Sequence, residues 1–183
     1  MHITIVDGNP ATSGKEYGRK LKDVTEALED SENDVTTITL AEKNIHGCTG
    51  CFSCWLKTPG VCVFKDDGVE FLKRLIHSDL VLFVSPLIMG FPSALLKNAI
   101  DRFIPMALPF IEMAKGECRH PMRYESSPLM ALLYDPEPDT DEEDIDIVST
   151  VFNRFARNAH TRFLFSMPLS ADPMEVRHAI ENI

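Results

Sequence analysis

Apolar residues along the chain fall into short aliphatic runs separated by longer stretches of mixed polarity. The first run ends at Asp7-Gly8-Asn9-Pro10, a segment of turn-forming residues. Runs rich in aliphatic and β-branched residues predict strands at His2 to Val6, Asp34 to Leu40, Leu80 to Val84, Leu129 to Tyr134 and Thr161 to Ser166. Leu80 to Val84 is a continuous apolar run, which is typical of a strand buried on both faces of a parallel sheet.

The stretches between these runs carry apolar residues at spacings of three and four. Tyr17, Leu21 and Val24 show the pattern after the first strand, and it indicates a helix with one buried face. Similar spacing predicts helices across 17–28, 69–76, 93–103, 145–155 and 172–183. Strands that alternate with helices in this way predict an α/β fold, in which helices cover both faces of a parallel sheet.

The alternation continues through the chain without an internal repeat or a linker. We therefore expect one domain over residues 1–183, with a cysteine-rich loop at about 46–66. The acidic stretch from Asp135 to Asp146 is expected to be a solvated loop after the fourth strand.

Charge and composition narrow the function classes. The formal net charge is −10, from 28 acidic and 18 basic side chains, so no basic surface is expected for a nucleic acid. The N-terminal segment MHITIVDG lacks the pattern of a signal peptide, and the apolar runs are too short to cross a membrane. We therefore expect a cytoplasmic protein with no nucleic-acid or membrane partner.

Cysteines form the most specific motif. Cys48, Cys51, Cys54 and Cys62 follow one another at spacings of three, three and eight positions, with turn-forming Gly50, Pro59 and Gly60 between them. Thiols stay reduced in the cytoplasm, so the spacing favours a metal or redox centre over disulfides. Three interpretations remain open at this point: an iron–sulfur cluster, a zinc ion, or thiols without a metal.

Ligands of open parallel sheets bind outside the carboxyl ends of the strands. This rule selects the loops at 7–16, 86–92 and 135–139, and we expect the cysteine loop at the same edge. A phosphate is expected at the start of the first helix, where the candidate contacts are Gly8, Asn9, Thr12, Ser13 and Gly14. A flat ring is expected against a stiff loop with four exposed apolar residues, where the candidates are Pro86, Leu87, Ile88, Met89 and Gly90.

Two of these segments resemble a known family. Residues Ser85 to Lys97, followed by Ile100-Asp101-Arg102, resemble the flavin-ring loop and helix of NADPH-dependent FMN reductases. The cysteine spacing is similar to that of iron–sulfur flavoproteins, a branch of the same superfamily. The resemblance covers residues 2 to about 104 and implies a flavodoxin-like three-layer sandwich. Its sheet would have five parallel strands in the order 2-1-3-4-5.

The same resemblance implies the cofactors. Residues 8–14 would bind the phosphate of FMN, residues 86–90 would line its isoalloxazine ring, and the four cysteines would hold a [4Fe–4S] cluster. The implied activity is that of an FMN-dependent oxidoreductase of the iron–sulfur flavoprotein type. Its partners would be small redox donors or acceptors such as NAD(P)H or ferredoxin, and the chain would form a homodimer or homotetramer.

Two alternatives to this function remain. The first is a cluster-free NAD(P)H-dependent FMN or quinone reductase in which the cysteines are structural. The second is a non-catalytic binding protein that has lost FMN. Glu16 and the acidic segment 135–138 motivate the second alternative, because they place negative charge near the expected flavin site.

Overall fold

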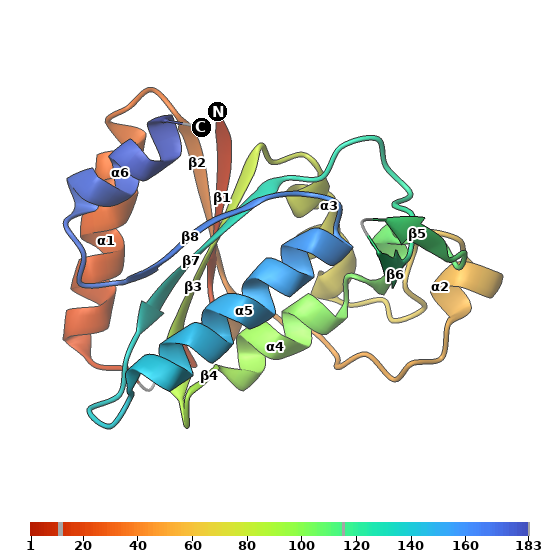
Figure 1. Cartoon of the computed structure of the whole chain (residues 1–183), viewed down its shortest axis with the longest axis horizontal. Helices are drawn as coiled ribbons and strands as arrows, with labels where there is room; N and C mark the ends of the chain where they lie inside the picture. The colour runs from red at the N-terminus through yellow and green to blue at the C-terminus, as the bar shows by residue number, and fades with distance from the viewer. Residues whose placement is uncertain (11–12, 115, 183) are drawn as a thin grey trace.

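The computed structural model describes residues 1–10, 13–114 and 116–182. The central sheet is built from β1 (His2–Asp7), β2 (Asp34–Thr39), β3 (Leu80–Ile88), β7 (Leu129–Asp135) and β8 (Phe163–Pro168). These strands are parallel and lie in the order β2-β1-β3-β7-β8 (Figure 1). The order confirms the predicted flavodoxin-like sheet.

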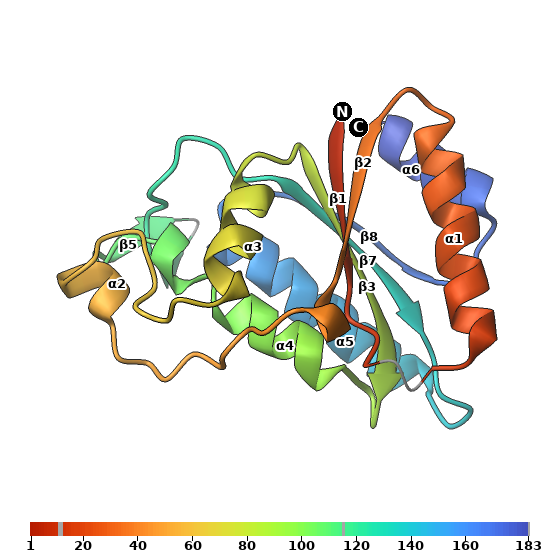
Figure 2. The same cartoon turned by 180° about the vertical axis from the view of Figure 1, so that it is seen from behind.

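Helices cover both faces of the sheet, as the sequence pattern predicts. The longer ones are α1 (Lys15–Glu29), α3 (Asp67–Ile76), α4 (Ala94–Asp101), α5 (Glu142–Asn158) and α6 (Pro173–Glu181). Helices α1 and α6 lie side by side on one face, and α3, α4 and α5 lie on the other (Figures 1 and 2). The predicted end of the last helix, Ile183, lies outside the described residues.

The central strand β3 explains why two helical layers are needed. Its residues Leu80, Leu82 and Val84 pack toward α1 and α6, while Val81 and Phe83 pack toward α3, α4 and α5. All five side chains are buried. A strand that is apolar on both faces is stable only when both faces are covered, because exposed apolar surface costs free energy in water.

Smaller elements complete the described part of the chain. They are η1 (Leu40–Glu42), α2 (Ser53–Leu56), β4 (Phe91–Pro92), η2 (Ile104–Met106), β5 (Glu112–Ala114) and β6 (Glu117–Arg119). Strand β4 turns back antiparallel onto the end of β3, and β5 pairs with β6 in a separate hairpin. Within the described ranges, no helix is long and apolar enough to cross a membrane.

The acidic stretch after β7 differs from its prediction as a loop through Asp146. Its second half forms the first turn of α5, which begins at Glu142. The Asp141 carboxylate accepts from the backbone N–H of Asp144 at 3.0 Å, and the Asp144 carboxylate accepts from that of Asp141 at 3.3 Å. Acidic side chains are favourable at this end of a helix because they satisfy free N–H groups and face the positive end of its dipole.

Candidate functional site

All four residues of the cysteine motif line one cavity of about 120 Å³, formed by the chain between β2 and α3 and by the end of α4. Cys54 is buried, Cys62 is half-buried, and Cys48 and Cys51 are exposed at the rim. Other walls of the cavity come from Val63, Phe64, Arg102, Ile104 and Pro105. The structure therefore brings together the four cysteines that the sequence motif selects, and it places Cys118 elsewhere, against a different hollow.

Tight turns fold this loop around the cavity. Gly50, Phe52 and Gly60 have φ values of 64°, 53° and 83°, in the left-handed region where glycine is favoured. The backbone N–H of Gly60 donates to the carbonyl of Cys54 at 2.9 Å, which returns the chain toward the short helix α2. The glycines of the motif thus allow sharp reversals between successive cysteines.

Trp55 anchors the loop to the rest of the domain. Its Nε1 donates to the carbonyl oxygens of Ile104 at 3.1 Å and Ala107 at 2.9 Å. Its ring lies 5.0 Å from the rings of both Phe52 and His120, measured between centroids. Side-chain packing and hydrogen bonds therefore hold α2 against η2 and the chain that follows β6.

The thiols influence one another electrostatically. Burial raises the pKa of the Cys54 thiol, and negative charge on Cys62, Cys48 or Cys51 raises it further. At the rim, a hydrogen bond from the backbone N–H of Ser53 lowers the pKa of Cys51. Four thiolates in one cavity repel one another, so the arrangement favours a bound group that carries positive charge.

The four cysteines line one cavity without converging on a single point. Across residues 1–10, 13–114 and 116–182, no three His, Cys, Asp or Glu side chains lie close enough together to share one ion. In a cubane cluster each thiolate binds a separate iron, so its four sulfur ligands stand farther apart around a central volume. The four cysteines that line this small, mostly apolar cavity are a donor set of the kind that such a cluster uses.

A buried cation borders the same cavity. The side chain of Arg102, directly after α4, is only 1% exposed. Its guanidinium donates to the two carboxylate oxygens of Asp66 at 2.7 and 2.9 Å and to the carbonyl of His46 at 2.7 Å. Burying a charge costs several kcal/mol unless it is paired, and this bidentate geometry supplies the pairing.

Asp66 is held from several directions as well. It caps α3, accepting from the backbone N–H of Gly68 at 3.0 Å, and it also accepts from that of His46 at 2.9 Å. Burial raises the pKa of this carboxyl, but Arg102 and the two N–H donors outweigh burial and lower the pKa to about 2. Asp66 is therefore ionised whenever the protein is near neutral pH.

At the carboxyl edge of the sheet, backbone N–H groups of the predicted phosphate loop already donate to acceptors within the chain. The backbone N–H of Gly8 donates to the carbonyl of Val84 at 2.7 Å, and that of Asn9 donates to the Asp7 carboxylate at 3.0 Å. The N–H of Ser13 faces the Asn9 side-chain oxygen at 3.4 Å, and Gly14 precedes α1 as its cap residue. Thr12 lies outside the described residues.

Acidic side chains surround this loop. Asp7 is buried and accepts a hydrogen bond from the Tyr17 hydroxyl at 2.9 Å, and burial raises its pKa. Lys20 contacts two carboxylates, Asp135 at 3.1 Å and Glu16 at 3.3 Å. The nearby positive charge of Lys20 is thus shared between two acids instead of being directed at a phosphate.

The predicted ring loop is partly a strand. Pro86 and Leu87 are buried within β3, contrary to the expectation of an exposed Leu87, because Pro86 pairs with Asp135 of β7 and Leu87 pairs with Pro92 of β4. Ile88 is 41% exposed and Met89 is 90% exposed. The backbone N–H of Met89 donates to the Glu137 carboxylate at 2.7 Å, and Gly90 turns at a φ of 74° toward β4.

The cysteine cavity does not lie at the carboxyl edge, which corrects the prediction that all candidate chemistry meets there. From the end of β2 the chain runs sideways, and α2 projects from the flank of the domain, away from β4 and the start of α1 (Figures 1 and 2). No described residue of 8–14 or 86–90 lines the cysteine cavity. The contacts of Trp55 and Arg102 draw the loop toward the far end of α4 instead.

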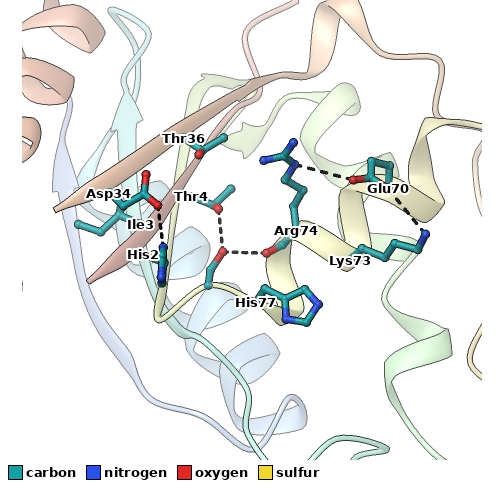
Figure 3. A pocket seen from close by; sticks show the side chains of 10 residues that line it. His2, Ile3, Thr4, Asp34, Thr36, Glu70, Lys73, Arg74 and His77 are labelled. Atoms are coloured by element: carbon teal, nitrogen blue, oxygen red, sulfur yellow. Dashed lines mark hydrogen bonds and ion pairs between the residues drawn. The ribbon is translucent and has the colours of Figure 1, made fainter.

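A larger hollow of about 460 Å³ lies at the opposite, amino edge of the sheet (Figure 3). Several of its polar side chains already pair with one another. His2 contacts Asp34 at 2.9 Å, and the Thr4 hydroxyl contacts that of Ser78 at 2.7 Å. Open parallel sheets bind ligands at the carboxyl edge, so we assign no function to this hollow.

Sequence reasoning missed the residues that support the cysteine cavity. Asp66 and Arg102 are 36 positions apart, and no periodicity links them. The segment Asp66-Asp67-Gly68 carries a helix-cap signal, but that signal does not reveal a buried cation beside it. Trp55 was visible as the chain's single tryptophan, without any sign of its contacts.

Comparison with known proteins places these features in context. A sequence profile of the family "NADPH-dependent FMN reductase" matches residues 1–118. An iron–sulfur flavoprotein of Archaeoglobus fulgidus is 39% identical over 97 residues, which cover 51% of this chain and 43% of that protein. An iron–sulfur flavoprotein of Methanocaldococcus jannaschii is 30% identical over 110 residues, which cover 60% and 55% respectively. The chain thus spans about half the length of these relatives.

Solved structures share the fold at low sequence identity. An NAD(P)H:quinone oxidoreductase from Methanothermobacter marburgensis superposes with a TM-score of 0.69 and 16% identity, covering 100% of this chain and 98% of that one. An FMN-dependent NADH-azoreductase from Bacillus anthracis superposes with a TM-score of 0.62 and 14% identity, covering 100% and 95%. At these identities the likeness establishes the fold alone.

Proposed function

This chain belongs to the NADPH-dependent FMN reductase family, and from that premise we propose that it is a flavin-dependent oxidoreductase of the iron–sulfur flavoprotein type. The observation that carries the proposal is the single cavity lined by Cys48, Cys51, Cys54 and Cys62. The names of the relatives in Archaeoglobus and Methanocaldococcus support the same assignment.

In this proposal the four thiolates hold a [4Fe–4S] cluster. Val63, Phe64 and Ile104 form apolar walls that limit water around it. When bound, such a cluster carries single electrons, whereas a flavin exchanges one or two, so the pair connects one-electron and two-electron partners. The turns at Gly50 and Gly60 and the anchor at Trp55 hold the ligands in place.

We place the flavin at the carboxyl edge of the sheet. Gly8, Asn9, Thr12, Ser13 and Gly14 are the proposed contacts of its phosphate. Pro86, Leu87, Ile88, Met89 and Gly90 are the proposed lining of its ring, with Met89 the most exposed of the five. Because the backbone N–H groups of Gly8 and Asn9 already have acceptors, this loop must rearrange or use other donors to hold a phosphate.

The proposed partners are a small redox donor and acceptor, with NAD(P)H or ferredoxin as candidates. Within one chain, α2 of the cysteine loop projects from the flank of the domain, whereas β4 and the start of α1 lie at the carboxyl edge (Figure 1). That separation favours a homodimer or homotetramer, since a second copy can bring its own carboxyl edge near the cavity.

Iron and flavin analysis of the anaerobically purified chain tests the proposal. We expect a brown-yellow protein with roughly four irons per chain and bound FMN, as a cubane held by four cysteines requires. Zinc without iron would assign the cysteines a purely structural role. Colourless protein that takes up neither iron nor flavin during anaerobic reconstitution would contradict the proposal.

A cluster-free NAD(P)H-dependent flavin or quinone reductase is the second candidate. The observation that favours it is the lack, among the described residues, of three ligand side chains close enough to share an ion. The two candidates differ in their response to Cys51→Ser. A cluster-free reductase keeps its NAD(P)H-driven flavin reduction, whereas an iron–sulfur flavoprotein loses iron and the electron transfer that depends on it.

A further inference from the structure

Arg102 stands in a fixed position beside the cysteines. Asp66 and the carbonyl of His46 hold one edge of its guanidinium, and the ring of Phe64 lies 5.7 Å from its central carbon. A Cβ atom on Gly68 would come within 2.8 Å of the guanidinium, so the lack of a side chain at Gly68 makes room for the cation in this position. The cation therefore has little freedom to move away from the cavity.

The Arg102 guanidinium borders the cysteine cavity directly, whereas the Asp66 carboxylate that pairs with it does not. Within the described part of the chain, the buried Nε of Arg102 has no hydrogen-bond partner. The ion pair thus presents its positive end toward the sulfur ligands.

We propose that Arg102, held by Asp66, raises the reduction potential of the centre bound by Cys48, Cys51, Cys54 and Cys62. This inference rests on the proposed function. Reduction adds one electron, supplied by the reduced flavin, and takes up no proton, so the negative charge of the site grows by one. A fixed cation stabilises the more negative form more strongly, and nearby charge and hydrogen bonds to sulfur are known to tune such centres.

A purely structural role is the alternative. Asp66 caps α3 and Arg102 follows α4, so their ion pair also fastens the cysteine loop to both helices. A structural brace affects folding and iron retention, but it does not shift the potential of a centre that is fully loaded. The reduction potential therefore separates the two roles.

The experiment compares four proteins after anaerobic reconstitution. The double variant D66N/R102M removes the ion pair, while the amide introduced at position 66 can still accept from the backbone of α3. R102K keeps the positive charge without the planar fork. The matched control K97Q/D101N removes an exposed ion pair on α4, the helix that Arg102 follows, again without change in net charge. Each sample is assayed for iron, for its circular dichroism and for the potential of the cluster, titrated by electron paramagnetic resonance.

We expect D66N/R102M to titrate at a more negative potential than the wild type, with R102K and K97Q/D101N close to the wild type. An unchanged potential in D66N/R102M, or an equal shift in R102K, would overturn the inference. A folded D66N/R102M that retains no iron would assign the pair to holding the loop and would overturn it too. If D66N/R102M does not fold, D66N/R102Q replaces it. A wild type without a cluster would refute the proposed function itself, and the inference with it.

Discussion

Two buried carboxyl groups lie in different regions of this molecule and have opposite pKa shifts. Beside the cysteine cavity, Asp66 faces the guanidinium of Arg102, and its pKa falls to about 2. At the carboxyl edge of the sheet, Asp7 is bonded to neutral donors on Tyr17 and Asn9, and burial raises its pKa. The same side chain is thus stabilised as an anion at one end and disfavoured as an anion at the other.

The difference shows which of the two regions tolerates negative charge on its own side chains. Arg102 is buried beside the four cysteines, where its positive charge would offset the negative charge of the thiolates that we propose as ligands. The carboxyl edge contains acids whose nearest cation, Lys20, is already shared by Glu16 and Asp135. Phosphate binding is therefore expected to be the weaker of the two cofactor interactions.

The largest effect is expected at the buried cysteine. Cys54→Ser should abolish most of the bound iron, because an alcohol is a poor substitute for a thiolate ligand and Cys54 lies inside the cavity. The measurement is iron per chain after anaerobic reconstitution. Cys118→Ser, outside the cavity, is the control and should retain iron. Equal iron in the two variants would remove the cysteine cavity from the proposal.

Loss of the buried carboxylate should destabilise the fold strongly. Asp66→Asn leaves the Arg102 charge buried without its counter-charge, and such changes cost about 3–5 kcal/mol. Asp101→Asn breaks the exposed pair with Lys97 and should cost less than about 1 kcal/mol. Urea unfolding of both variants measures the difference. Similar losses in the two variants would show that burial of the Asp66 pair contributes little.

The two carboxyl groups should also give opposite pH dependence. Because the pKa of Asp66 is lowered to about 2, ionised Asp66 adds about 2 kcal/mol to the free energy of unfolding above roughly pH 4. This stabilisation is lost as the pH falls toward about 2. The pKa of Asp7 is raised, so protonated Asp7 adds to the free energy of unfolding below roughly pH 4. This stabilisation is lost as the pH rises through the pKa that Asp7 has in the folded protein.

Unfolding free energies of the iron-free protein between about pH 2.5 and 7 check both statements. In Asp66→Asn, the free energy of unfolding should fall less steeply between about pH 4 and 2.5 than in the wild type. In Asp7→Asn, the free energy of unfolding near about pH 7 should rise relative to its value at acid pH. An acid limb in Asp66→Asn as steep as that of the wild type would contradict the assignment of Asp66.

The smallest expected effect concerns the flavin. Asp7→Asn keeps an acceptor for Tyr17 and for the N–H of Asn9 but removes a negative charge beneath the proposed phosphate site. At a pH above the folded pKa of Asp7, we expect roughly fivefold tighter FMN binding, which corresponds to about 1 kcal/mol of relieved repulsion. Flavin fluorescence titration measures it. Asp23→Asn, on the exposed side of α1, is the control of equal charge change and should leave the affinity unaltered.

Much of the fold was predictable because it depends on local periodicity. The apolar run Leu80 to Val84 predicted a strand buried on both faces, and the helical spacing of Tyr17, Val24 and Leu28 predicted the buried face of α1. The extension of β3 through Pro86 was not predictable, since it depends on a neighbouring strand that is distant in the sequence. The helical turn at Glu142 was missed because acidic runs occur both in loops and at helix starts.

The candidate site, like the fold, combines features that neighbouring residues predict with features that depend on distant segments. By itself the sequence determined the sheet, its covering layers and the four cysteines, because strand runs, helical spacing and short ligand gaps are properties of neighbouring residues. Only the tertiary structure decided that the cysteine loop lies on the flank of the domain and that Arg102 and Asp66 meet beside it. Such a pairing depends on where two distant segments pack, and the free energy of burying a charge becomes visible only there.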